Sequence, residues 1–528
     1  MSWLGKLFRS GAAEQAPSRA VVELPPDLLA ALATHSFEEV SAILRLWCKE
    51  HRTPESAKAA VSAARASGWS DEGLDKLEIF IEFYGGDPVK AFESSRRHLT
   101  AKRFDADLFV ICLLSLYQNN QFEDAAKYLR LAQGHEDVLA DRWDYWFGRS
   151  LILWAVNDMV GLNEAADRMY ALNPDDMTTM ENACAMSLEL GDMTRFDALR
   201  KKLTQGKTEP GYAYALNTLA IGDYEQGFRQ MEARYEMEEA FRYINRALFE
   251  LPRWHGEDLT GKTLLVSAEQ GLGDTVQMAR YLPFLLALPG ARIAMETQPQ
   301  TMSLLQFNFP AIEFVVRAYA QRPPIDFDLW VGSMSLPHIF GTTGDNVPGR
   351  AGYLQVPPEN VGYWRERVAD WAKGNRPKIG LAWSGQNTHR ADRRRSVPFA
   401  LMMQSVQAVD ADFFAIQTSV PEGAARNLIN VSEEMVTLAD TAALIAEMDL
   451  VITVDTSVVH VAGALAKETW LLLPFRYEWR WGLEGEGNRW YDSVRVLRQT
   501  KHGDWAGLLD EVFGRRLPDW RESLGRSR

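Results

Sequence analysis

The amino-terminal half of the chain has the hydrophobic periodicity of α-helices. From Leu24 to Tyr235, apolar residues recur at helical spacing in segments of roughly 10–16 residues, separated by short polar breaks. No segment alternates apolar and polar residues as a half-buried strand does. The pattern predicts an all-α region.

The breaks between these helices recur at a regular interval. One break, Gln118–Gln121, separates an apolar helix over Leu108–Tyr117 from a second helix in which Ala125 allows close approach. Similar patterns occur at Leu162–Pro174, at Leu188–Asp192 and at Ala220–Phe228. The interval of roughly 30–40 residues resembles that of tetratricopeptide (TPR) repeats, and predicts a solenoid of about four to six helix pairs that binds a protein partner. Several consensus positions are missing, so a plain helical bundle is the alternative.

The pattern changes after Leu259–Lys262, where short apolar runs alternate with helical segments. This alternation predicts parallel, doubly wound sheets in two Rossmann-like halves, which bind ligands at the carboxyl ends of their strands. The predicted strands are Thr263–Ser267, Arg292–Glu296, Glu313–Val316, Phe327–Val331, Lys378–Trp383, Phe413–Gln417, Leu450–Val454, Thr469–Leu473 and Val494–Leu497.

These patterns define the expected domains. We expect a flexible tail over 1–23, TPR-like helical repeats over 24–235 and a linker over 236–261. Two Rossmann-like halves follow, over 262–356 and 357–528. The fold class is therefore all-α repeats followed by an α/β region.

Composition and charge exclude several classes of protein. The 528 residues are 46% hydrophobic and carry a formal net charge of −14, which fits a folded protein and disfavours nucleic-acid binding. The three cysteines, Cys48, Cys112 and Cys184, are too widely spaced for a disulfide framework or a zinc site. With no signal segment and no apolar run of about 18 residues, we expect a cytoplasmic protein without a membrane span.

The first predicted strand leads into the loop Glu269–Thr275. Gly271 and Gly273 permit a tight turn and close approach of a ligand to the backbone. Val276 stands at the third glycine position of a dinucleotide fingerprint, so that motif is absent. Asp274 has two possible roles: a cap of the following helix, or a carboxylate in the cleft that accepts a proton from a hydroxyl group.

A second loop follows the strand that begins at Lys378. It contains Trp383, Ser384 and Gly385, and then a local cluster of guanidinium groups that includes Arg393 and Arg395. Arginine forks and backbone amides bind phosphate well. The alternative is a solvated basic turn paired with neighbouring acids.

A third loop, Asp455-Thr456-Ser457, lies between the strand Leu450–Val454 and a helix that carries His460. The unpaired amides of that helix start and the two hydroxyl groups would stabilise a phosphate. His460 could reach the same ligand, or it could be a buried histidine of the core. Since no spacing of His or carboxylate residues is typical of a metal site, we expect no metal ion.

Several motifs, in this order, resemble the bacterial TPR-containing glycosyltransferases. They are Gly222–Gly227, Leu251–Leu259, Glu269–Gln277, Asp392–Ser396, Val454–Leu465, Leu472–Trp481 and Trp490–Arg495. The resemblance implies a GT-B fold with a catalytic part similar to heptosyltransferases. It also implies a nucleotide-sugar donor in the carboxy-terminal half, an acceptor held by the other half and the repeats, no cofactor, and Asp274 as the catalytic base.

One departure from this family concerns the positive charge that would bind the donor phosphate. Many relatives have Lys-Gly after the strand at Phe413–Gln417, whereas this chain has Gln417-Thr418-Ser419. The positive charge would come from Arg393 or Arg395, or the donor would carry one phosphate, as a CMP-nonulosonic acid does. Related TPR transferases that modify flagellin use such donors, which makes flagellin a candidate acceptor.

The predicted function is therefore metal-independent transfer of a sugar to a protein selected by the repeats. The predicted donor-binding residues are Gly271, Gly273, Trp383, Ser384, Gly385, Arg393, Arg395, Gln417, Asp455, Thr456, Ser457 and His460. A non-catalytic scaffold that retains the fold is the alternative, and transfer to a lipid or polysaccharide is disfavoured by the lack of a membrane-binding stretch.

Overall fold

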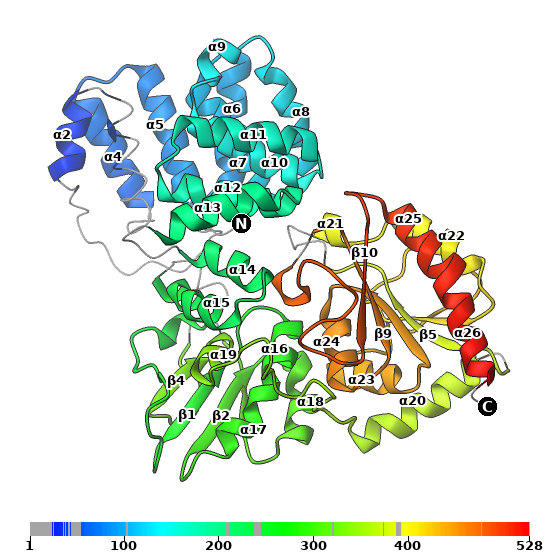
Figure 1. Cartoon of the computed structure of the whole chain (residues 1–528). Helices are drawn as coiled ribbons and strands as arrows, with labels where there is room; N and C mark the ends of the chain where they lie inside the picture. The colour runs from blue at the N-terminus through cyan, green and yellow to red at the C-terminus, as the bar shows by residue number, and fades with distance from the viewer. Residues whose placement is uncertain are drawn as a thin grey trace. The chain divides into compact units, whose positions relative to one another are not determined.

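A computed structural model of the chain is shown in Figure 1. The chain divides into two compact units, Met1–Met186 and Ser187–Arg528, and the division falls inside one helix. The predicted tail over 1–23, Cys48, and the part of the second loop from Asn387 to Ala391 lie outside the described residues. The structure describes residues 24, 26–34, 36, 39–40, 43, 54–101, 104–205, 211–236, 244–318, 321–372, 374–386, 392–476 and 478–526.

The predicted all-α region is confirmed, since every regular element described before residue 236 is a helix. Its α-helices are α2 (Pro26–Thr34), α4 (Pro54–Ala66), α5 (Asp71–Tyr84), α6 (Pro88–Ala101), α7 (Ala106–Gln118), α8 (Phe122–Leu129), α9 (Glu136–Leu139), α10 (Trp143–Ala155), α11 (Met159–Leu172), α12 (Met177–Leu190), α13 (Met193–Thr204), α14 (Tyr212–Ala220) and α15 (Tyr224–Met231). Short 3₁₀ segments are η1 (Arg130–Ala132) and η2 (Glu232–Glu236).

The helices are joined in pairs by turns of one kind. Each turn contains a residue with positive φ: Gly86, Asn120, Asn157, Gly191 and Gly222. Neighbouring turns are thus 31–37 residues apart, close to the 34-residue period of TPR repeats. Glycine and asparagine tolerate this left-handed conformation best, which explains their recurrence at these positions.

The residue after the turn caps the second helix in four of these pairs. The side chains of Asp87, Asp158, Asp192 and Asp223 each accept a hydrogen bond from the backbone N–H three residues on, at 3.0–3.3 Å. An aspartate at this position accepts a hydrogen bond from an otherwise unpaired amide, and its negative charge interacts favourably with the helix dipole. The turn and the cap together define the repeat.

Small residues let the paired helices approach closely, as the sequence predicts for Ala125. Ala125 is fully buried in α8. In the pair α14–α15, a Cβ atom added at Gly227 would lie 2.6 Å from Cγ of Leu219 and 3.0 Å from its backbone nitrogen. The spacing of this pair therefore depends on the missing side chain of Gly227.

The first sheet contains β1 (Thr263–Ser267), β2 (Arg292–Thr297), β3 (Glu313–Val316) and β4 (Leu329–Gly332). The strand order is β3-β2-β1-β4, and all pairs are parallel. Its helical segments are α16 (Leu272–Met278), η5 (Ala279–Tyr281), α17 (Leu282–Leu286), α18 (Pro299–Asn308), η6 (Ser333–Ser335) and α19 (Leu336–Ile339); η4 (Arg246–Leu248) precedes β1.

The second sheet has six parallel strands in the order β10-β9-β8-β5-β6-β7. They are β5 (Lys378–Ala382), β6 (Asp412–Ala415), β7 (Leu428–Asn430), β8 (Leu450–Val454), β9 (Thr469–Leu473) and β10 (Val494–Arg498). The helical segments are α20 (Pro358–Trp371), α21 (Asp392–Arg395), α22 (Phe399–Gln407), α23 (Leu438–Ala446), α24 (Ser457–Ala464), η7 (Trp479–Trp481), α25 (Trp505–Leu509), the π-helical η8 (Asp510–Arg516) and α26 (Leu517–Arg526).

The predicted fold class, all-α repeats followed by two Rossmann-like regions, is confirmed. All nine predicted strands occur, five of them with bounds that differ by one to three residues. The prediction missed β7, which has only three residues and whose Ile429 and Asn430 are not buried. So short an edge strand leaves too little alternation in the sequence to be recognised.

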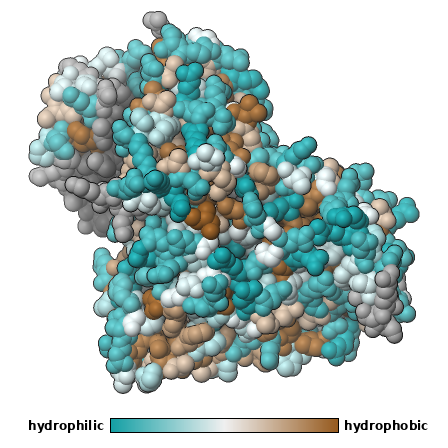
Figure 2. Space-filling view, in the orientation of Figure 1, coloured by the Kyte–Doolittle hydropathy of each residue, from teal (hydrophilic) through white to brown (hydrophobic). Residues whose placement is uncertain are grey.

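The surface shown in Figure 2 mixes hydrophilic and apolar residues, with apolar patches over the part of the molecule that holds β1 and β2. Exposed large apolar side chains in the region of the first sheet include Phe284, Leu286, Phe307 and Val316. Within the described residues, every helix is too short or too polar to cross a membrane.

The close packing of α14 against α15 generates a prediction. Gly227→Ala introduces a Cβ atom that overlaps Leu219, so we expect the free energy of unfolding to fall by about 1–3 kcal/mol. The matched control is Gly362→Ala in α20, where nothing lies within 4 Å of the added Cβ atom and alanine favours the helix. Chemical denaturation of both variants tests this, and equal stabilities would contradict the packing of this pair.

Candidate active site

The loops after β1 and β8 meet where α16 packs against α24. A Cβ atom added at Gly273 would lie 2.6 Å from Cδ2 of His460 and 3.3 Å from Cα of Ser457. Only a glycine allows this approach without displacing α24. The loops at the carboxyl ends of β1 and β8 therefore lie side by side, where parallel sheets commonly bind ligands.

Asp274 lies in the first turn of α16, at the third helical position, with Gly271 as the N-cap residue. Its Oδ2 accepts a hydrogen bond from the backbone N–H of Gly271 at 2.8 Å, and its Oδ1 pairs with the guanidinium of Arg480. The side chain stays 18% exposed, so solvent or a ligand can reach it. Asp274 thus both caps its helix and presents a carboxylate at the site.

Arg480 belongs to η7, beyond β9, and its guanidinium is buried. Besides Asp274, it donates from Nε to Oε1 of Gln277 at 2.6 Å and pairs through Nη1 with Oε2 of Glu478 at 2.7 Å. The surrounding carboxylates raise the pKa of Arg480 despite its burial, so it remains charged.

Two further carboxyl groups lie near this cation. Burial and the charge of Glu478 raise the pKa of Asp455 to about 7, against the opposing effect of Arg395 and Arg480. Burial also raises the pKa of Glu478. Near neutral pH the pair therefore retains a proton in part of the population.

His460 is buried one turn into α24. Its Nδ1 lies 3.0 Å from the hydroxyl oxygen of Tyr491, and its ring stacks on Trp481 with centroids 5.6 Å apart. Burial, together with the charges of Arg480 and Arg280, holds the pKa of His460 well below 6.5. The imidazole is therefore neutral at physiological pH.

Thr456 and Ser457 form the start of α24. Thr456 is the N-cap residue, and its hydroxyl oxygen accepts from the backbone N–H of Val458 at 3.3 Å. Ser457 is the first helical residue and is partly exposed. This end of α24 faces Gly273 of α16, so the helix start lies at the junction of the two halves.

Gln417 ties the loop after β5 to the end of β6. Its Oε1 accepts from the backbone N–H groups of Trp383 and Ser384 at 2.9 and 3.0 Å, and its Nε2 donates to the carbonyl oxygen of Ser384 at 3.1 Å. The Trp383 ring is buried in the core of the second half. These backbone amides therefore have partners within the protein.

The backbone amide of Gly385 also has a partner within the protein. It donates to Oδ1 of Asp392 at 3.0 Å, and a Cβ atom at Gly385 would overlap the guanidinium of Arg395. Arg395 in turn donates from Nη1 to the carbonyl oxygen of Asp455 at 2.8 Å. Arg393, two residues earlier in α21, is exposed. Of the two predicted arginines, Arg395 thus contacts the third loop.

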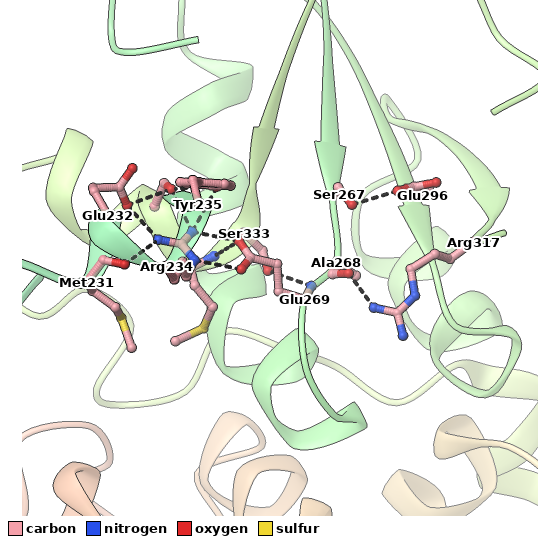
Figure 3. Close-up of polar contacts among 12 residues, drawn as sticks. Met231, Glu232, Arg234, Tyr235, Ser267, Ala268, Glu269, Glu296, Arg317 and Ser333 are labelled. Carbon is pink, nitrogen blue, oxygen red and sulfur yellow. Dashed lines mark hydrogen bonds and ion pairs between the residues drawn. The ribbon is translucent and has the colours of Figure 1, made fainter. Parts of the chain in front are cut away.

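A second buried arginine connects the last repeat to the first sheet (Figure 3). Arg234 of η2 makes a two-pronged ion pair with Glu269, the second residue after β1, at 2.8 Å for each bond. It also pairs with Glu232 at 2.8 Å and donates to the hydroxyl group of Ser335 at 2.8 Å. This network fixes the base of the loop that carries Asp274.

A cavity of about 530 Å³ lies beside Arg480. It opens between the helices α13–α15 and the segment 480–489. Its lining includes Arg200, Leu219, Tyr224, Arg480, Trp481 and Arg489.

The structure thus brings Gly273 together with Ser457 and His460, and Asp274 together with Arg480. The neighbouring strands β5, β6 and β8 of the second sheet are followed by the predicted residues Trp383, Ser384, Gly385, Gln417, Asp455 and Thr456. Arg395 of α21 contacts Asp455, and Arg393 of the same helix is exposed. Sequence reasoning missed Arg480, Glu478 and Gln277 as site residues. The available signal was an arginine between two tryptophans, Trp479 and Trp481, since an arginine in so apolar a segment needs a buried partner.

Among the residues that the structure describes, no group of three or more His, Cys, Asp or Glu side chains is arranged to hold a metal ion.

Comparison with known proteins finds a family model that matches part of the α/β region and a relative that matches most of the chain. The model of glycosyltransferase family 9 (heptosyltransferase) matches residues 415–470, from the end of β6 to β9. Protein FlbA of Caulobacter vibrioides is 26% identical over 438 residues, which cover 75% of this chain and 70% of FlbA. The resemblance to glycosyltransferases of the heptosyltransferase type is thereby confirmed, and it supports glycosyl transfer.

Two solved structures are also similar to the chain over half or more of its length. The Escherichia coli ADP-heptose lipopolysaccharide heptosyltransferase II is 15% identical, with 50% of this chain and 98% of that chain covered and a TM-score of 0.36. A variant of the Thermobaculum terrenum O-GlcNAc transferase is 12% identical, with 96% and 94% covered and a TM-score of 0.32.

The environment of His460 predicts a pH dependence of stability. Because its pKa is held below 6.5 only in the folded protein, acid protonates the unfolded chain first, and stability is lost as the pH falls below about 6.5. The raised pKa of Asp455 acts in the opposite direction, adding stability as the pH falls through about 7.

Comparison of His460→Gln with the unmodified protein isolates the histidine. We expect the variant to lose less thermal stability between about pH 7 and pH 5, by up to about 1.4 kcal/mol per pH unit. The control is His338→Gln, which changes an exposed histidine. Parallel pH profiles for wild type and His460→Gln would refute a neutral, buried imidazole.

Proposed function

We propose that this protein transfers a sugar from a nucleotide-sugar donor to a hydroxyl group of a protein acceptor. The observation that carries the proposal is the junction at Gly273, which packs against Ser457 and His460 of the other half while the adjacent Asp274 pairs with Arg480. A donor at the second half and an acceptor at the first would meet there. In this proposal residues 262–356 form the acceptor side and residues 357–528 the donor side.

In the proposed reaction Asp274 is the general base. The acceptor hydroxyl oxygen forms a bond to the anomeric carbon while the bond from that carbon to the phosphate oxygen breaks. The hydroxyl proton goes to the carboxylate of Asp274, and the nucleotide leaves as its phosphate anion. The partial exposure of Asp274, and its fixed bonds to Gly271 and Arg480, support this role.

The proposed donor site is the carboxyl edge of the second sheet. Thr456 and Ser457 at the start of α24 supply hydroxyl groups and the positive end of a helix dipole. Arg395 is the arginine that lies against this loop. The backbone amides of Ser384 and Gly385 already donate to side chains of the protein. In this proposal, charged side chains therefore contribute more to phosphate binding than these amides do.

The proposed acceptor is a polypeptide that the helical repeats select, because paired helices with a 31–37-residue turn interval are typical of protein-binding repeats. Flagellin, modified with a nonulosonic acid, is the first acceptor to test. A cytoplasmic location is part of the same proposal and rests on the widely spaced cysteines.

The proposed reaction needs neither a metal ion nor a cofactor. Developing negative charge on the leaving phosphate would be met by Arg395 and by the helix dipole of α24. The alternative, a non-catalytic scaffold, gives no reason for an accessible carboxylate to lie at the junction of the two halves.

The proposal predicts the effect of Asp274→Asn. The asparagine side chain is of nearly equal size and can still accept the Gly271 N–H, but it cannot take a proton, so transfer should fall by about 10²- to 10⁴-fold. The measurement is sugar transfer by each purified variant to a purified candidate acceptor. The intact mass of the acceptor gives the extent of transfer, in a buffer with a metal chelator.

The control for this prediction is Asp504→Asn, at the N-cap of α25. Both variants should keep a folded structure in thermal unfolding, although Asp274→Asn also weakens the pair with Arg480. Wild-type turnover in Asp274→Asn would exclude Asp274 as the base.

A further prediction concerns the donor. Ser457→Glu places a negative charge at the start of α24, so nucleotide affinity should fall by roughly 10- to 100-fold through repulsion of the phosphate. Calorimetry with a panel of nucleotides and nucleotide sugars gives the affinity. Ser523→Glu, at an exposed serine, is the control, and unchanged affinity in Ser457→Glu would remove this loop from the donor site.

A further inference from the structure

The guanidinium of Arg480 distributes its three nitrogen atoms over three different side chains. Nη2 pairs with Asp274, Nε donates to Gln277 and Nη1 pairs with Glu478. Asp274 and Gln277 both belong to α16, whereas Arg480 and Glu478 belong to the segment after β9. One buried cation therefore links the two halves of the α/β region.

We propose that Arg480 is a positioning residue for the transfer reaction: it holds the Asp274 carboxylate in one orientation at the junction of the two halves. This inference rests on the proposed function, because it assigns the role of base to Asp274. It adds a residue, from the other half of the molecule, on which that base depends.

The geometry of α16 supports the inference. Asp274 and Gln277 are three residues apart, so their side chains lie on one face of the helix. Arg480 contacts both, which fixes the rotation of that face as well as the position of one carboxylate. Each oxygen of Asp274 then has one fixed donor, the Gly271 N–H for Oδ2 and the Arg480 guanidinium for Oδ1.

Burial makes the arrangement specific. The Arg480 side chain is 7% exposed, whereas Asp274 is 18% exposed, so the carboxylate is the more accessible of the two groups. A planar guanidinium offers several donors in fixed directions, and a lysine cannot reproduce them. The pair can therefore orient the base without blocking it.

Further charged and titratable groups face this cluster. Asp455 and His460 come from the β8–α24 segment, Arg395 from α21, Arg280 from η5, and Tyr224 from α15. Removal of the Arg480 charge leaves Asp274, Asp455 and Glu478 with one cation fewer. At least one carboxylate of the cluster should then bind a proton at a higher pH than in the wild type.

The test compares Arg480→Gln and Arg480→Lys with the wild type in the full-length protein. We expect Arg480→Gln to lower kcat by roughly 10- to 100-fold, with a smaller change in KM for the donor. The acid limb of the pH profile of kcat should move to higher pH. Arg480→Lys retains the positive charge but loses the planar guanidinium, so its kcat should lie between those of Arg480→Gln and the wild type. The acid limb of its pH profile should stay at the pH of the wild type.

Arg367→Gln is the matched control, since Arg367 pairs with Glu434 at 2.5 Å in the same half of the molecule. It should leave kcat and its pH profile unchanged. Thermal midpoints of all variants are measured on the same preparations. If Arg480→Gln does not fold, Arg480→Lys remains informative, because wild-type kcat in that variant would overturn the inference.

The two proposals fail in different ways. Absence of transfer by the wild-type protein would overturn the proposed function and, with it, the role of Arg480. Transfer by the wild type together with an unchanged kcat in Arg480→Gln would overturn the positioning role alone. Increased turnover in Arg480→Gln would also overturn it, because Arg480 would then act as a restraint on Asp274.

Discussion

The buried cation at Arg480 is the interaction on which the arrangement of the α/β region depends. Ionised carboxylates are costly to bury unless a cation and hydrogen bonds compensate them. Asp274, Asp455 and Glu478 surround Arg480, and Arg395 is the second cation that lowers the pKa of Asp455. Burial, together with the neighbouring charge of Glu478, outweighs these two cations, so the pKa of Asp455 rises.

A steric constraint acts at the same junction as this charge constraint. Gly273 lets α16 contact α24 at Ser457 and His460, and the contact brings the Asp274 carboxylate within reach of Arg480. A larger residue at 273 would separate the helices and leave Arg480 without its partner from the first half. The packing of the two helices and the pairing of the two charges therefore specify the same geometry. Together they position the functional groups more firmly than either interaction would alone.

Local patterns predicted the elements well and the contacts poorly. The alternation of apolar runs gave nine strands correctly, because each strand is encoded within a few adjacent residues. The loops of Asp274 and Asp455 could be placed at carboxyl ends for the same reason. The partnership of Asp274 with Arg480 joins residues 206 positions apart, and the saturation of the Ser384 and Gly385 amides depends on the side chains of Gln417 and Asp392. No local pattern specifies such contacts.

The end of the helical region belongs structurally with the sheets. The compact unit that begins at Ser187 includes α13, α14 and α15 as well as both sheets. Arg234 pairs with Glu269 beside β1, Arg489 donates to the carbonyl oxygen of Gly222, and Glu189 pairs with Arg394 of α21. These contacts tie the last helices to both halves, and the 530 Å³ cavity lies between α13–α15 and the segment 480–489. A polypeptide held by α13–α15 would thus have a fixed position relative to Asp274, which links acceptor recognition to the proposed chemistry through side chains already in place.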